Sequence, residues 1–175
     1  MSDDVKALPW RHISQSSNAA LRYIDGRRKG DIKSLTTPWK KFNTISMGGI
    51  EWQTITTIAG MSGSGKTAVL GQLETGLKDL NPDEDFAILS FNFEMLSSRL
   101  VARKLSNKMK ITTQQLYSAS ETFSLNDNYY MNAVKEARKL NEYDIYYVDV
   151  PGSVKSLEAT VLKFSKEMAK PVVVM

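Results

Sequence analysis

The stretch Gly60-Met61-Ser62-Gly63-Ser64-Gly65-Lys66-Thr67 matches the pattern G-x-x-x-x-G-K-S/T at every fixed position. Its glycines let the backbone curl so that N–H groups point inward around an anion. The ammonium of Lys66 can reach the β and γ phosphates of a nucleotide, and the hydroxyl of Thr67 can coordinate Mg²⁺. Residues Gly60 through Ala68 are therefore predicted to bind a nucleoside triphosphate, and we expect ATP with Mg²⁺.

The flanks of this loop carry two different periodicities. Residues 54–59 are of the β type, which predicts a strand that leads into the loop. After the loop, apolar residues recur at helical spacing: Val69, Leu70, Leu73 and Leu77. The partial positive charge at the start of this helix would favour a phosphate. The alternative is a glycine-rich turn that contains a lysine by chance. Such a turn needs no strand before it and no helix after it, so these flanks favour the phosphate-binding loop.

Further strands and helices alternate along the rest of the chain. The run 86–93 is almost continuously apolar, as in a strand buried on both faces of a parallel sheet. Other strands are expected at 145–150 and 172–175, and helices at 96–109, 128–140 and 157–169. This alternation predicts an α/β protein with a doubly wound, mainly parallel sheet that binds ligands at the carboxyl ends of its strands.

The chain divides into two parts. Residues 1–17 are polar and read as an arm without a core of its own, while 18–29 can form a short helix. We expect residues 1–29 to be an arm with a linker helix and 30–175 to be the core. His12, the only histidine, lies in the arm and is assigned no role.

Composition limits the class of protein. The 175 residues suffice for one core, and the absence of cysteine excludes disulfides and thiolate metal sites. The N-terminus shows no apolar run of the kind found in secreted or membrane proteins, so we expect a cytoplasmic protein that does not contact membranes.

The net charge of +4 comes partly from two basic clusters. The first contains Arg27, Arg28, Lys29, Lys33, Lys40 and Lys41, and the second contains Arg99, Arg103, Lys104, Lys108 and Lys110. Neither shows the interleaved aromatic residues expected of a platform that stacks bases. We interpret both mainly as solvated or subunit-facing surface. Five tyrosines are interpreted as core or half-buried packing: Tyr129, Tyr130, Tyr143, Tyr146 and Tyr147.

Hydrolysis of a bound nucleotide also needs a group that orients water. Glu94 follows the apolar run 86–93, so it would lie at the carboxyl end of that strand and could polarise a water aimed at the γ phosphate. It could equally cap the following helix. Asp149 follows a second apolar run and could hold Mg²⁺, although the Pro151-Gly152 turn beyond it makes a turn-forming role as plausible.

Three stretches together resemble the motor domain of DnaB-type replicative helicases, a RecA-like fold. They are the phosphate loop, Phe91-Asn92-Phe93-Glu94-Met95, and the run from Ile145 to Gly152, and the resemblance covers roughly residues 28–175. It implies that Glu94, with Lys66, is catalytic and that Asp149 is structural. It also implies a homo-oligomeric ring, commonly a hexamer, a linker helix docked on a neighbouring subunit, and translocation on single-stranded DNA driven by ATP hydrolysis.

The chain also departs from the family pattern. From the residues before the matching region we expect no counterpart of the family's helical N-terminal domain, and the match stops at the strand expected at 172–175, whose end carries the Mg²⁺-associated aspartate in the family. We likewise expect no counterpart of the family's DNA-contacting loops and arginine finger in these 175 residues. We therefore expect the core to be incomplete at its C-terminus, and three functions stay open: a helicase motor, a nucleotide-binding assembly or regulatory module without useful turnover, and another RecA-like ATPase or a P-loop kinase.

Overall fold

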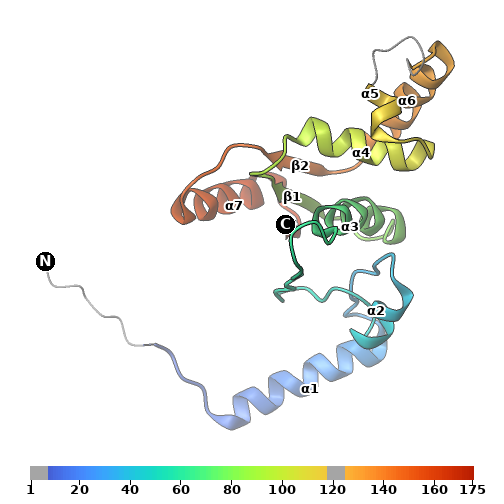
Figure 1. Cartoon of the computed structure of the whole chain (residues 1–175). Coiled ribbons are helices and arrows are strands. Elements are labelled where there is room, and N and C mark those ends of the chain that lie inside the picture. The colour runs from blue at the N-terminus through green and yellow to red at the C-terminus, as the bar shows by residue number, and fades with distance from the viewer. Residues whose placement is uncertain (1–7, 118–124) are drawn as a thin grey trace, which may run out of the picture.

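The computed structural model describes residues 8–117 and 125–175 and has a parallel sheet at its centre (Figure 1). The sheet consists of β1 (Ala87–Phe91), β2 (Ile145–Val148) and β3 (Val172–Val174) in the order β2-β1-β3. Both neighbours pair with β1 in parallel. The apolar character of β1 is explained by this central position, and the parallel sheet predicted from the sequence is confirmed.

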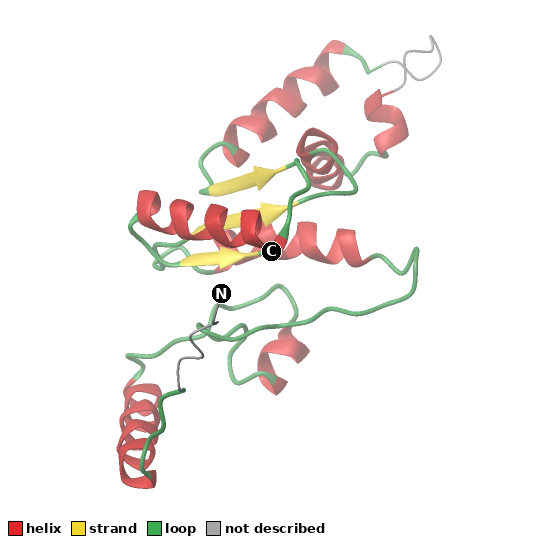
Figure 2. Ribbon diagram, turned by 90° about the vertical axis from the view of Figure 1, so that its left-hand side faces the viewer, coloured by secondary structure: helices red, strands yellow, loops and turns green. Residues whose placement is uncertain are grey.

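Helices cover both faces of the sheet, with α3 (Lys66–Leu80) and α4 (Ser97–Met109) on one side. Leu77 of α3 and Ile88 of β1 are fully buried in the same apolar cluster. On the other side lies α7 (Val154–Met168), as Figure 2 also shows. There the ring of Phe164 meets that of Tyr146, with centroids 4.9 Å apart. The sheet is therefore doubly wound, as predicted.

The remaining helices lie before α3 and around α4. They are α1 (Ile13–Lys29), α2 (Lys40–Ile45), α5 (Thr113–Tyr117) and α6 (Asp127–Leu140). The sequence periodicity predicted α6 but neither of the short helices α2 and α5, which are too brief to show a period. No described helix is long and apolar enough to cross a membrane.

Helix α1 begins earlier than the sequence analysis expected. The arm was expected to reach residue 17, but α1 starts at Ile13 because His12 caps it: the imidazole accepts a hydrogen bond from the backbone N–H of Ser14, and the side chain of Gln15 accepts one from the N–H of His12. His12, to which no role was assigned, is thus a helix cap. Residues 1–7 of the arm lie outside the described part of the chain.

The segment that follows α1 packs against α3. Leu35 is buried in the core and forms an isolated antiparallel bridge with Ile50. Pro38 lies so close to α3 that only glycine fits opposite it, since a Cβ built on Gly76 would meet the Cγ of Pro38 at 2.2 Å. The contact between Pro38 and Gly76 therefore holds the segment that follows α1 against α3, the helix that begins directly after the phosphate loop.

We predict that Gly76→Ala destabilises the protein despite the higher helix propensity of alanine. The clash with Pro38 should cost about 1–3 kcal/mol in the free energy of unfolding, because backbone or ring must shift. Gly71→Ala is a matched control in the same helix, since its Cβ would meet only Lys104 Cε at 3.9 Å and should stabilise by roughly 0.5–1 kcal/mol. Denaturant unfolding of both variants measures the difference, and equal stabilities would contradict the packing described.

The expected strand at 54–59 is wrong for this structure. The segment is extended and exposed, with Ile55 96 % accessible, and it belongs to no described strand. Its β-branched composition favours an extended backbone, but a strand also needs a partner edge, and β3 pairs only with β1. The phosphate loop therefore connects an extended unpaired segment, not a strand, to α3. β3 lies at a sheet edge, as expected for the last valine run.

Candidate nucleotide-binding site

The loop at residues 60–67 has a backbone that only glycine adopts easily at two positions. Gly63 has φ 77° and Gly65, the N-cap of α3, has φ 93°, both in the left-handed region. Gly60 is constrained differently, because a Cβ there would lie 2.5 Å from the Oγ of Ser64. The three glycines are thus explained by the local geometry.

This geometry leaves a row of backbone donors at the start of α3. Within the described residues, no acceptor takes a hydrogen bond from the N–H groups of Gly65, Lys66, Thr67 or Ala68. Such donors at the start of a helix, together with the helix dipole, make an anion site. The residues present therefore fit a polyphosphate.

The side chain of Lys66 lies over the same loop. Its Nζ donates hydrogen bonds to the carbonyl oxygens of Gly60, at 2.8 Å, and Met61, at 3.0 Å. Both carbonyls are neutral, so a phosphate oxygen would make a stronger, charge-assisted bond with the ammonium. Lys66 is thus held where a bound phosphate could compete for it.

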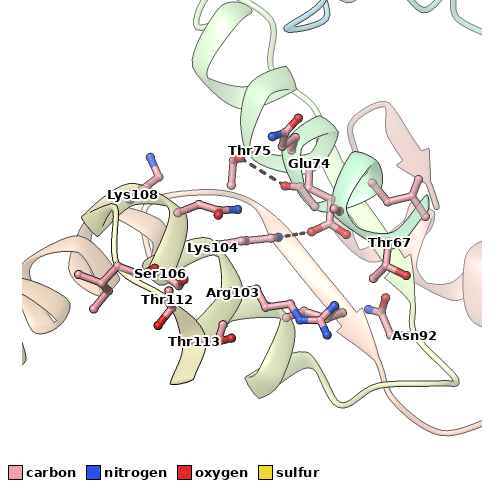
Figure 3. A pocket seen from close by; sticks show the side chains of 17 residues that line it. Thr67, Glu74, Thr75, Asn92, Arg103, Lys104, Ser106, Lys108, Thr112 and Thr113 are labelled. Atoms are coloured by element: carbon pink, nitrogen blue, oxygen red, sulfur yellow. Dashed lines mark hydrogen bonds and ion pairs between the residues drawn. The ribbon is translucent and has the colours of Figure 1, made fainter. Parts of the chain in front are cut away.

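Thr67 lies at one end of a cavity between α3, α4 and α5, with a volume of about 590 Å³. Asn92 and Arg103 line the same cavity. Figure 3 shows the guanidinium of Arg103 directed toward Asn92 and Thr67. The cavity therefore combines the hydroxyl expected to coordinate Mg²⁺ with a cation and an amide.

Glu94 is exposed in the turn between β1 and α4, at the carboxyl end of β1 as expected. It does not line the cavity that contains Thr67, whereas Asn92, two residues earlier, does. Of the predicted site residues, Thr67 and Ala68 therefore share this cavity, and Glu94 does not line it.

The interpretation of Glu94 as a helix cap is wrong, because Asp149 serves α4 instead. The Asp149 carboxylate accepts hydrogen bonds from the backbone N–H of Ser97, at 2.9 Å, and from its hydroxyl, at 2.6 Å. The N-cap position itself, Leu96, offers no side-chain acceptor. Asp149, directly after β2, therefore anchors the start of α4 to the sheet and has a structural role.

We predict that Asp149→Ala lowers the free energy of unfolding by about 1–2 kcal/mol, since α4 loses two charge-assisted hydrogen bonds at its positive end. Glu94→Ala should leave stability within about 0.5 kcal/mol, because Glu94 is an exposed turn residue. Urea unfolding of the two variants compares them. A larger loss for Glu94→Ala would restore Glu94 as the cap.

One residue of the second basic cluster differs from the surface interpretation. Lys104 is only 7 % exposed and forms an ion pair with Glu74. Arg103 is exposed, in line with that interpretation, and also lines the cavity beside Thr67. A signal was present in the sequence, since Lys104 follows Leu100 by four residues and so lies on the apolar stripe of its helix. Three of the five tyrosines are exposed, contrary to the packing expected for them: Tyr129, Tyr130 and Tyr146, although the ring of Tyr146 meets that of Phe164.

No cluster of three His, Asp or Glu side chains in residues 8–117 or 125–175 could hold a metal ion. The prediction that Mg²⁺ binds together with the nucleotide, at the hydroxyl of Thr67, is a separate one that this finding does not test.

Comparison with solved structures supports the fold. One similar structure is described as an ATPase domain, with a TM-score of 0.71 and 18% sequence identity over 90% of this chain. Another is described as a DnaB-like replicative helicase and its interactions with primase, with a TM-score of 0.67 and 18% identity over 99% of this chain. The chain spans 55% and 39% of those two proteins' lengths. A comparison with curated proteins gave no match.

The family comparison covers most of the sequence. The model for the DnaB-like helicase C terminal domain matches residues 34–175, which include the phosphate loop, β1 with Glu94, and Asp149. The fold is accordingly the RecA-like α/β fold of these ATPase domains, with three strands in the described part of the chain. The chain belongs to the family of DnaB-like helicase C-terminal domains.

Proposed function

We propose that residues 60–68 bind Mg·ATP. The observation that carries this proposal is the set of four backbone donors at the start of α3, from Gly65 to Ala68, beneath the ammonium of Lys66. In the proposed complex the amides and Lys66 bind the phosphates, and Thr67 coordinates Mg²⁺. The metal, when bound, neutralises charge on the β and γ oxygens.

Hydrolysis requires two further groups in this proposal. Glu94 would orient the attacking water, and Arg103, whose guanidinium is directed toward Thr67, would balance negative charge on the terminal phosphate. Because Glu94 is in an exposed turn, the proposed reaction needs the turn to move toward the loop once a nucleotide is bound. Catalytic side chains commonly reach their final distances only in the substrate complex.

For the whole protein we propose a cytoplasmic DNA helicase that assembles as a homo-oligomeric ring and translocates on single-stranded DNA. Residues 30–175 form the ATPase core and residues 1–29 form the arm and linker helix. Helix α1 has no buried residue, and apolar side chains such as Leu21 and Ile24 are exposed on it. This surface suits docking onto a neighbouring subunit.

A second function is favoured by one observation, which is that Glu94 does not line the cavity with Thr67. Under this alternative, the chain binds nucleotide without useful turnover and serves in assembly or regulation. Both functions require the same phosphate loop, so they differ only in hydrolysis and in its response to DNA.

Steady-state release of phosphate from Mg·ATP, measured with and without single-stranded DNA, separates the two functions. The motor predicts turnover that DNA stimulates and that Lys66→Ala removes. The module predicts tight nucleotide binding with a rate equal to that of Lys66→Ala. A chain that binds no nucleotide would contradict both.

A further inference from the structure

A buried ion pair lies between the two helices that flank the candidate site. The side chains of Glu74, on α3, and Lys104, on α4, are 3 % and 7 % exposed. Ser90 donates a hydrogen bond to Glu74 Oε1 at 2.7 Å. Lys104 Nζ donates to the hydroxyl of Tyr147 at 2.6 Å, and this hydroxyl donates to Glu74 Oε2 at 3.2 Å. Both carboxylate oxygens of Glu74 thus accept hydrogen bonds, and Lys104 Nζ donates two.

Stability alone does not account for this pair. Two charges lose their hydration on burial, and apolar side chains of similar volume usually stabilise a core as well or better. Unlike apolar contacts, the hydrogen bonds of the pair are directional, so they restrict how the four side chains can be arranged. Burial, and next the charge of Glu74, raise the pKa of Tyr147, so that its hydroxyl stays protonated and remains a donor.

Three of the four side chains, those of Glu74, Lys104 and Ser90, come from or next to the segments that carry polar groups of the cavity. Glu74 lies two turns after Thr67 on α3, and Lys104 is adjacent to Arg103 on α4. Ser90 lies two residues before Asn92, whose amide reaches the Ser90 hydroxyl at 3.4 Å. Thr67, Asn92 and Arg103 therefore lie on, or directly after, elements that the ion pair and its hydrogen bonds join (Figure 3).

We propose that Glu74 and Lys104 are positioning residues that hold Arg103 at the distance from Thr67 at which a triphosphate, and not a diphosphate, completes the site. This inference rests on the proposed nucleotide binding. Arg103 gains from a third phosphate only if α4 keeps its rotation relative to α3, and the ion pair fixes that rotation. Without the pair, the guanidinium of Arg103 is no longer held at a fixed position relative to Thr67, so its interaction with the third phosphate weakens. The loop amides still bind the first two phosphates.

The test compares dissociation constants of two probes by calorimetry: Mg²⁺ with the β,γ-imido analogue of ATP, and Mg·ADP. The variant Glu74→Gln/Lys104→Met removes both charges and keeps the side-chain volumes. We expect it to bind the triphosphate analogue roughly tenfold more weakly and to bind ADP within about twofold of the parent. The ratio of the two constants isolates the third phosphate from general effects on the fold.

A matched control is Glu136→Gln/Lys139→Met, the same two substitutions at a more exposed ion pair on α6. Its ratio should equal that of the parent. An unchanged ratio in the folded Glu74→Gln/Lys104→Met variant overturns the positioning role but leaves the proposed function intact. A parent that binds neither probe refutes the proposed function, and the inference with it.

The single substitution Glu74→Gln keeps the test usable if the double variant does not fold. The amide still accepts from Ser90 and has the shape of the carboxylate, but it no longer balances the charge of Lys104. A reduced triphosphate-to-diphosphate preference in this folded variant supports the proposal, and an unchanged preference overturns it. Circular dichroism of each variant verifies the fold.

Discussion

Lys66→Ala is expected to weaken Mg·ATP binding by at least about a hundredfold, or roughly 3 kcal/mol. The ammonium is the only side-chain cation held on the loop among the described residues, where it donates to the carbonyls of Gly60 and Met61. Its loss removes the ammonium that would pair directly with the β and γ phosphates and leaves Mg²⁺ to balance more of their charge. Equilibrium titration with a fluorescent ATP analogue measures the change.

The matched control is Lys163→Ala on α7, an exposed lysine whose nearest carboxylate oxygen, on Glu167, is 3.8 Å away. It should bind the analogue as the parent does. Stability should change by less than about 1 kcal/mol in both variants, because both lysines are at least partly exposed. Parent-like affinity of Lys66→Ala would show that the loop is not the nucleotide site.

Glu94→Gln is expected to retain Mg·ATP affinity within about threefold and to lose turnover by roughly 10²–10⁴-fold. The amide has the shape of the carboxylate but cannot accept a proton from the attacking water. Glu94 is an exposed turn residue, so the substitution should not disturb the fold. Single-turnover hydrolysis of bound ATP separates the chemical step from nucleotide binding and release.

Glu158→Gln, an exposed residue of α7, is the control for this substitution and should hydrolyse ATP at the parental rate. Equal rates for Glu94→Gln and the parent would remove Glu94 from the mechanism. A parental rate that already equals that of Lys66→Ala would instead favour the function without turnover.

The helices and strands of the core were predictable because short stretches of sequence, through the spacing of their apolar residues, determine where each one forms. The apolar run that contains β1 and the helical spacing after Lys66 both arise from burial against the sheet, and each is complete within a short stretch of sequence. The loop was predictable for a similar reason. Its glycines adopt backbone conformations that other residues rarely adopt, and its lysine contacts a carbonyl of the same eight-residue stretch. All of these features can be seen in the sequence of the loop itself.

The segment 54–59 shows a feature that the local sequence pattern does not predict, which is whether an extended segment pairs with a neighbouring strand. Its composition predicts a strand, but strand formation depends on a neighbouring edge that no short stretch of sequence specifies. The capping of α4 by Asp149 was equally out of reach, since Asp149 and Ser97 are 52 residues apart and only the paired strands β1 and β2 bring them together.

The pair formed by Glu74 and Lys104 was predictable in part. Each falls on an apolar helical stripe, Glu74 between Leu70 and Leu77 and Lys104 after Leu100, which marks both as buried charges. That they meet each other, and that Arg103 beside them enters the cavity with Thr67, depends on how α3 packs against α4.

Calorimetric titration of the parent with Mg·ATP, Mg·ADP and adenosine tests the central claim most directly. If the amides at the start of α3 and the ammonium of Lys66 bind the phosphates, affinity must follow the phosphate chain, and adenosine should bind at least about a hundredfold more weakly than Mg·ATP. Tripolyphosphate should compete with the nucleotide. Adenosine binding as tight as that of Mg·ATP, or no heat with any of the three, would contradict the account.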